Sequence, residues 1–140
     1  MTLYLAAFIS AVFAALTSIL AKIGNKNVDS NLATAIRTSV ILIFTWGIVF
    51  FQGSQNSIHN ISKNSMLFLI LAGIATGLSW LFYFYALKVG SASKVVPIDK
   101  LSLVLTIILA GIILGEKISL QVILGSVLMT IGAIVIAFAK

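Results

Sequence analysis

Two side chains of opposite charge interrupt otherwise apolar stretches of this 140-residue chain. Arg37 lies near the start of one stretch, and Asp99 lies near the start of another, with Lys100 directly after it. An ion in hydrocarbon is costly, so each of these residues is a candidate for function. Arg37 and Asp99 can form an ion pair or line a polar pathway. In the alternative interpretation, Arg37 and Lys100 only extend their charges to the membrane surface along their aliphatic stems.

Uncharged polar and aromatic side chains recur at helical spacing in two of the apolar stretches. Thr76, Trp80, Tyr83 and Phe84 share one helical face, and Ser102 and Thr106 share another. Such faces are expected to turn toward a cavity or another helix, because lipid offers hydroxyls no partner. Two other interpretations stay open. The hydroxyls can bond to carbonyls of their own helix, and the aromatic side chains can form an interfacial belt.

Four further residues are expected to shape the backbone. Gly111 and Gly115 have the spacing of a helix-packing motif. Pro97 is expected in the first turn of a helix, where its missing N–H is tolerated. If that helix begins nearer residue 92, Pro97 instead interrupts it and frees backbone carbonyls. Glu116 opposes the helix dipole at a cost of about 0.3–1 kcal/mol, which favours a structural role such as capping a neighbouring helix.

No catalytic arrangement is present in the sequence. There is no Ser/His/Asp set, no phosphate-binding glycine loop and no metal-ligand spacing. The chain has no cysteine, and His59 is expected at the surface of a polar loop. The nine Lys and Arg residues are dispersed, so no basic stripe could neutralise neighbouring phosphates of a nucleic acid. We therefore expect no enzyme, cofactor, metal site or nucleic-acid partner.

The composition requires a lipid bilayer as the environment of the chain. Hydrophobic residues make up 61% and charged residues 9%, with a mean hydropathy of +1.20, whereas soluble domains run at roughly 45–50% and about 25%. The apolar runs predict an all-α integral membrane protein forming one domain, with the first run retained as a span rather than cleaved as a signal peptide. The five predicted transmembrane helices cover approximately residues 3–23, 32–51, 66–87, 95–114 and 120–139.

The distribution of basic residues predicts the orientation of the chain. With five spans, the loops after the first and third helices lie on the same side as the C-terminus. That side carries or adjoins Lys22, Lys26, Arg37, Lys88, Lys94, Lys100 and Lys140, whereas the other side has only Lys63 and Lys117. We therefore expect the N-terminus outside and the C-terminus in the cytoplasm.

The second half of the chain resembles EamA-type proteins of the drug/metabolite transporter superfamily. The similarity is carried by residues 85–97 (YALKVGSASKVVP), by the LGEK of residues 114–117, and by residues 121–125 and 132–133. Arg37 also stands where this family often has an arginine. The resemblance covers essentially the whole chain.

This resemblance implies one half of an inverted-repeat transporter, because most EamA proteins contain two five-helix repeats. Such transporters place their substrate site near the midplane, between the repeats. A single repeat would have to dimerise, either as an antiparallel homodimer, as a heterodimer with an oppositely oriented half, or as a parallel dimer. The first, third and fourth helices would line the cavity. The first helix has no acid, so the proton exchange of four-helix multidrug exporters does not carry over.

The resulting prediction is a transporter of a small metabolite in the plasma membrane of a bacterium or archaeon. It would work by alternating access, with Arg37 and Asp99 near the cytoplasmic gate and the uncharged candidates toward the cavity. Its partners would be the lipid bilayer, a small-molecule substrate and a second half. Two alternatives stay open: a flippase for a lipid-linked substrate, and a non-transporting partner subunit of another membrane protein.

Overall fold

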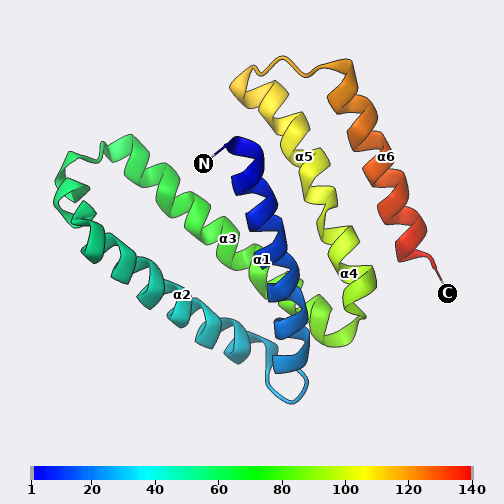
Figure 1. Cartoon of the computed structure of the whole chain (residues 1–140), viewed down its shortest axis with the longest axis horizontal. Coiled ribbons are helices and arrows are strands. Elements are labelled where there is room, and N and C mark those ends of the chain that lie inside the picture. The colour runs from blue at the N-terminus through cyan, green and yellow to red at the C-terminus, as the bar shows by residue number, and fades with distance from the viewer. Residues whose placement is uncertain (1, 140) are drawn as a thin grey trace. The chain divides into compact units, whose positions relative to one another are not determined.

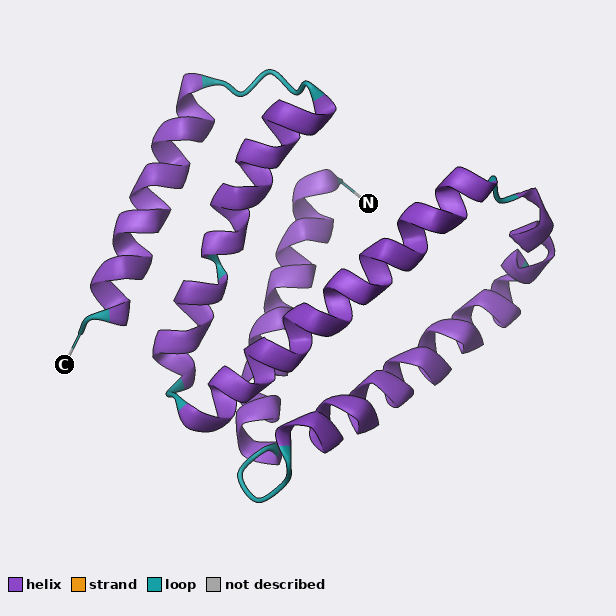
Figure 2. Cartoon of the chain, turned by 180° about the vertical axis from the view of Figure 1, so that it is seen from behind, coloured by secondary structure: helices purple, strands orange, loops and turns teal. Residues whose placement is uncertain are grey.

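The computed structural model describes residues 2–139, in which helices are joined by short loops and no β-strand occurs (Figures 1 and 2). Five spans are long and apolar enough to cross a membrane, which confirms the predicted all-α membrane fold. The elements are α1 (Leu3–Gly24), α2 (Ser30–Gln52), the 3-10 helix η1 (Ser54–Asn60), α3 (Lys63–Val89), α4 (Ala92–Asp99), α5 (Leu101–Leu109), the π-helical turn η2 (Ala110–Leu114) and α6 (Leu120–Ala137).

Helix α2 begins at Ser30, before the expected residue 32, because Asp29 caps it. The Asp29 carboxylate accepts backbone N–H groups of Asn31 at 2.9 Å and Leu32 at 3.1 Å. These bonds, led by that of Leu32, lower the pKa of Asp29 below its ordinary value. The helix ends at Gln52 and is followed by Gly53, whose φ of 71° lies in the left-handed region that glycine adopts without strain.

The fourth span is not one continuous helix. It begins at Ala92, so Pro97 lies in the second turn of α4 and the predicted first-turn position is wrong. Proline has no N–H to donate to the carbonyl four residues back, that of Ser93. The α-helix stops at Asp99 and resumes at Leu101, and Figure 2 shows this interruption as a short loop between two helical segments. The alternative expectation, a helix interrupted by Pro97, therefore describes the span.

The end of the fourth span is wider than an ordinary helical turn. The N–H of Glu116 bonds to the carbonyl of Ala110 at 3.2 Å, and Gly115 reverses the chain with a φ of 66°. A Cβ on Gly111 would meet Ile118 Cδ1 at 2.8 Å. Within this segment, Gly111 gives room to the Ile118 side chain and Gly115 terminates the turn.

The N-terminus of α6 is capped by Ser119, whose hydroxyl accepts the backbone N–H of Val122 at 3.4 Å. The cap of this neighbouring helix is thus not the carboxylate of Glu116. A capping role of Glu116 toward any other helix stays a prediction.

Contacts within the chain define two units, which we call the central unit (residues 21–88) and the terminal unit (residues 1–20 and 89–140). In the terminal unit, α6 lies alongside α4 and α5 and contacts both (Figure 1). The buried residues of α6 are the small Ser126 and Ala133. Lys94 Nζ, on α4, donates a hydrogen bond to the carbonyl of Ala139, just beyond α6.

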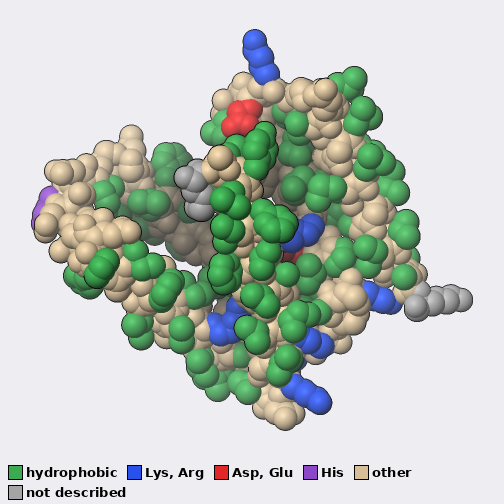
Figure 3. All heavy atoms as spheres, in the orientation of Figure 1, with side chains coloured by type: hydrophobic (Ala, Val, Ile, Leu, Met, Phe, Trp, Pro, Cys, Tyr) green, Lys and Arg blue, Asp and Glu red, His purple; other side chains and the backbone are tan. Residues whose placement is uncertain are grey.

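Most large apolar side chains are exposed, and they cover much of the surface seen in Figure 3. The buried share of each span runs from 0% in the fourth to 11% in the second and fifth. Apolar patches of this extent are not stable in water. Since helices satisfy their own backbone hydrogen bonds, these faces can lie against lipid or against another protein chain.

Candidate functional site

The Arg37 side chain lies over an aromatic ring in the central unit. Its Cζ atom is 3.5 Å from the centroid of the Phe84 ring. This contact connects the first part of α2 with the last part of α3. Phe84 is only 2% exposed. A guanidinium over a ring face is a cation–π contact, and it becomes stronger when water is excluded. Arg37 is thus positioned by a specific contact, and the ring fixes only one face of the guanidinium.

Two predicted pathway residues surround the same ring. Tyr83 packs edge-on against Phe84 with ring centroids 5.0 Å apart, and Trp80 lies at 6.3 Å. Three of the predicted pathway residues, Arg37, Trp80 and Tyr83, therefore lie around one residue that was not itself predicted as a pathway residue. We call Arg37, Trp80, Tyr83 and Phe84 the arginine–aromatic cluster. Its geometry suits a ligand that has both a charged group and a flat apolar part.

A second set of polar contacts fixes the end of α3 on which the cluster stands. Lys22 Nζ donates to the carbonyls of Leu87 at 2.6 Å and Lys88 at 3.4 Å, and the Asn25 amide donates to the carbonyl of Phe84 at 3.3 Å. Carbonyls of the last helical turn have no donor within their own helix. Lys22 supplies both the donor and a positive charge that the helix dipole favours there. We call Lys22 and Asn25 the α3 clamp.

Buried positions of the central unit gather at this end of the helices. Leu87 is fully buried, and Asn25 is 1% exposed. The other buried residues of the unit are Ala21, Ser30, Ala33, Thr34 and Phe84. All of them come from the end of α1, the loop after it, the first turns of α2 or the last turns of α3. The small core of this unit is therefore also the platform of its charged candidate residue.

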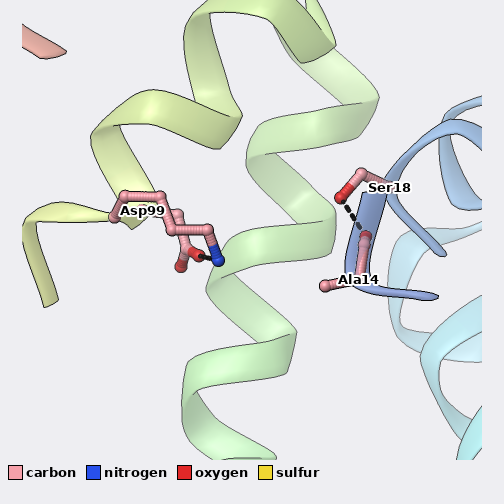
Figure 4. Close-up of polar contacts among 4 residues, drawn as sticks. Ala14, Ser18 and Asp99 are labelled. Carbon is pink, nitrogen blue, oxygen red and sulfur yellow. Dashed lines mark hydrogen bonds and ion pairs between the residues drawn. The ribbon is translucent and has the colours of Figure 1, made fainter. Parts of the chain in front are cut away.

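The terminal unit carries the remaining ionised candidate. Asp99 pairs with its neighbour Lys100 at 3.7 Å, with side chains 35% and 54% exposed (Figure 4). A half-exposed pair between adjacent residues contributes little to stability. The pair lies where α4 ends and α5 begins. Ser102 and Thr106 follow on α5, and both are exposed.

The hydroxyl candidates bond to their own helices. The Thr76 hydroxyl donates to the carbonyl of Ala72, and that of Thr106 donates to the carbonyl of Ser102, both at 2.8 Å. Ser18 does the same with Ala14 at 2.9 Å (Figure 4). This is the back-bonding that the sequence left open as an alternative. It leaves each hydroxyl oxygen able to accept a further bond, so a pathway role of Thr76 and Thr106 stays a prediction.

Lys22 and Asn25 are the site residues that the sequence did not single out. Phe84 stands four residues after Trp80, the spacing of neighbours on one helix face, so the sequence placed it beside Trp80 and Tyr83 but did not predict it as a pathway residue. Lys22 and Asn25 have the appearance of ordinary loop-flanking residues. Among the described residues, no group of three or more His, Cys, Asp or Glu side chains could hold a metal ion.

These features define a multi-pass, α-helical membrane protein with a charged cluster inside one of its units. The sequence model of the EamA-like transporter family matches residues 1–138, across both units. The chain belongs to this family, which confirms the resemblance found in its sequence. It is also 46% identical over 131 residues to an "Uncharacterized transporter in cobO 3'region" of Sinorhizobium sp., covering 94% of this chain and 93% of that protein. No solved structure matches the chain.

Proposed function

We propose that the protein transports a small metabolite across the plasma membrane by alternating access, as a dimer of five-helix halves. The observation that carries this proposal is the match of a transporter family to residues 1–138, which contain one set of five spans. The relative is of nearly equal length and is itself named a transporter. Family membership supports a transporter rather than an enzyme.

The low burial of the polar residues in the fourth span supports the proposed second half. None of the fourth span is buried, although it carries Asp99, Ser102 and Thr106. Hydroxyl and carboxylate groups of a membrane helix are expected to face a protein or a water-filled cavity. In the proposed dimer, each half covers these residues of the other and encloses the pathway between the two.

Each candidate residue has a role in this proposal. Arg37 and Asp99 lie near the cytoplasmic gate, and Thr76, Trp80, Tyr83, Ser102 and Thr106 face the cavity. The α3 clamp holds the end of α3 against the loop after α1. Movement of α3 relative to α2 would change the environment of Arg37, because the guanidinium stands on the Phe84 ring.

Transport is tested with purified protein in liposomes and an isotope-labelled mixture of amino acids, organic acids, amines and nucleosides. We expect at least one class of compound to accumulate above protein-free vesicles, as measured by mass spectrometry of the washed vesicles. Arg37→Gln is expected to reduce this uptake, whereas Lys26→Gln, which changes an exposed loop cation of the same unit, should not. Uptake equal to that of protein-free vesicles for every class would contradict the proposed transport.

The form of the dimer is tested by its topology in intact cells. The chain has no cysteine, so Asn27→Cys, in the loop before α2, and Asn56→Cys, in η1 after it, provide two single labelling sites at exposed positions. About half labelling of both sites by a membrane-impermeant maleimide would support an antiparallel homodimer. Labelling of one site alone would show a single orientation. That outcome requires an oppositely oriented partner chain or a parallel dimer, and labelling of Asn56→Cys alone would agree with the expected N-out orientation.

A further inference from the structure

The guanidinium of Arg37 has no counter-ion within the central unit. Asp29 is the only acidic residue in the first 98 positions of the chain. Its carboxylate caps α2 by accepting the N–H groups of Asn31 and Leu32, and it lies about 12 Å from Arg37 along the helix, at about 1.5 Å per residue. The charge of Arg37 is therefore balanced by no carboxylate of its own unit.

The nitrogen Nη1 of Arg37 is buried and meets no hydrogen-bond acceptor among the described residues. A guanidinium carries five N–H donors in a planar fork. The Phe84 ring lies 3.5 Å from Cζ and satisfies a face of the group, not its edge. A buried charged donor without an acceptor is unfavourable, so this geometry is suited to an acceptor that comes from outside the unit.

We propose that the arginine–aromatic cluster binds the carboxylate of a monoanionic substrate, with Arg37 as the binding group and Phe84 as its positioning residue. This inference rests on the proposed transport function and names the chemical class of its substrate. A carboxylate offers two oxygens that match two N–H groups of the fork. Trp80 and Tyr83, on the same ring, receive the apolar remainder of the substrate.

The available positive charge favours one negative charge on the ligand. Lys22 is engaged with the carbonyls of Leu87 and Lys88, so Arg37 is the cation that the cluster itself supplies. A phosphate monoester carries nearly two charges at neutral pH. It would leave an uncompensated charge in a medium of low polarity, which is costly. A single carboxylate forms a neutral pair with Arg37.

Binding is tested in neutral detergent with Trp80 as the reporter. The chain has two tryptophans, and Trp46 packs against Phe50 on α2, so Trp46→Phe leaves the one that lies in the cluster. The probes are phenylacetate with its neutral analogue phenylacetamide, and butyrate with butyramide. We expect the carboxylates to change the Trp80 fluorescence and to bind at least about tenfold more tightly than the amides. This comparison of carboxylates with amides is made with Arg37 unchanged, so it does not depend on the folding of an Arg37 variant.

Variants locate the effect at the guanidinium. In the Trp46→Phe background, Arg37→Gln should abolish the response to carboxylates. Arg37→Lys should weaken it, because lysine keeps the charge but loses the fork and the stacking surface. The matched control is Lys26→Gln, which removes an exposed cation of the same unit and should leave the response unchanged. Circular dichroism and elution as a single species verify the fold of each variant.

Three results would overturn the proposal. The first is equal binding of carboxylates and amides, or no response to any carboxylate. The second is an undiminished carboxylate response in the Arg37→Gln variant, because the guanidinium would then not be the binding group. The third is an Arg37-dependent change of Trp80 fluorescence with phosphatidylglycerol that carboxylates do not reverse, because Arg37 would then bind a lipid phosphate.

The binding assay and the transport assay can fail separately. Carboxylate binding without uptake into liposomes would contradict the transport proposal and leave the binding site intact. Uptake of an amine or nucleoside, together with no binding of carboxylates in detergent, would overturn the substrate class and leave transport intact.

Discussion

In the terminal unit α6 packs along α4 and α5. In the central unit the buried residues of α2 and α3 lie only at the start of α2 and the end of α3, and the other ends of the two helices are linked through η1. The buried residues of α6, Ser126 and Ala133, lie two turns apart along the helix. Those of α2 all lie in its first two turns, and those of α3 in its last two. Small side chains allow long, close helix contacts in membranes. Charged and aromatic contacts can join two helices at one place and leave the rest of their length without protein neighbours in the unit.

This difference assigns separate tasks to the two units. A helix pair in contact along its length behaves as a rigid scaffold, because many small contacts must break together. A pair whose buried contacts are confined to one end has fewer contacts to break when the angle between its helices changes. The central unit, which contains Arg37 over Phe84, therefore has the more suitable construction for a binding site whose access changes during transport.

The largest effect is expected at the ring that joins α2 to α3. Phe84→Ala should destabilise the protein by about 3–5 kcal/mol, because it removes a buried aromatic side chain and leaves a cavity. The matched control is Phe82→Ala on the same helix, where the side chain is 74% exposed and little change is expected. Unfolding in mixed detergent micelles, followed by circular dichroism, measures both. Equal effects would show that the Phe84 junction does not hold the central unit together.

The α3 clamp should contribute the next largest effect. Lys22→Met removes the donor to the carbonyls of Leu87 and Lys88, and hydrogen bonds that involve a charged group contribute about 1.5–3 kcal/mol. Lys26→Met removes an exposed cation a few residues away and serves as the control. The same unfolding measurement applies. If the two variants are equally stable, the end of α3 is fixed by apolar contacts alone.

In the terminal unit, the expected effect comes from enlarging a small buried residue of α6. Ala133→Leu adds bulk at a position that is 7% exposed, and overpacking costs about 1–3 kcal/mol. Val135→Leu, at a position 64% exposed, should be nearly neutral. Full stability of Ala133→Leu would mean that α6 is not closely packed there, and the contrast between the units would disappear.

The smallest effect is a pH dependence at the start of α2. The folded state lowers the pKa of Asp29 through the backbone N–H groups that it accepts. The contribution is therefore complete above the ordinary carboxyl range and is lost as the pH falls below about 4, through the lowered folded value. Asp29→Asn should remove this dependence from the unfolding midpoint between neutral and acidic pH. An unchanged pH profile in that variant would assign the dependence to another group.

The fold could be predicted from the sequence because length and hydropathy define membrane helices almost without tertiary information. The ends of the helices were harder to predict from the sequence. Helix α3 begins at Lys63 rather than near residue 66, since polar residues can extend a helix beyond its apolar part. Pro97 was misplaced for a related reason: Ala92 begins the helix, and the polar residues after it gave no apolar signal for that start.

The candidate site was predictable in its parts but not in its assembly. Arg37, Trp80 and Tyr83 were identified because polar and aromatic residues are unusual inside apolar runs. Their common contact with Phe84 depends on how α2 approaches α3, which no local pattern encodes. Likewise, the carbonyls that accept hydrogen bonds from Lys22 lie 65 and 66 residues away, in the last turn of α3. The ion pair between Arg37 and Asp99 stays a prediction.

Because the helices differ in length, the thickness of the membrane is expected to affect them differently. Helix α3 has 27 residues and α6 has 18, which correspond to about 40 Å and about 27 Å at about 1.5 Å per residue. The hydrocarbon core of a bilayer measures about 30 Å. Helix α3 must therefore tilt or extend into the headgroups, whereas α6 barely crosses. Longer acyl chains would act first on α6 and the scaffold around it, and shorter ones would act first on α3, on which the arginine–aromatic cluster stands.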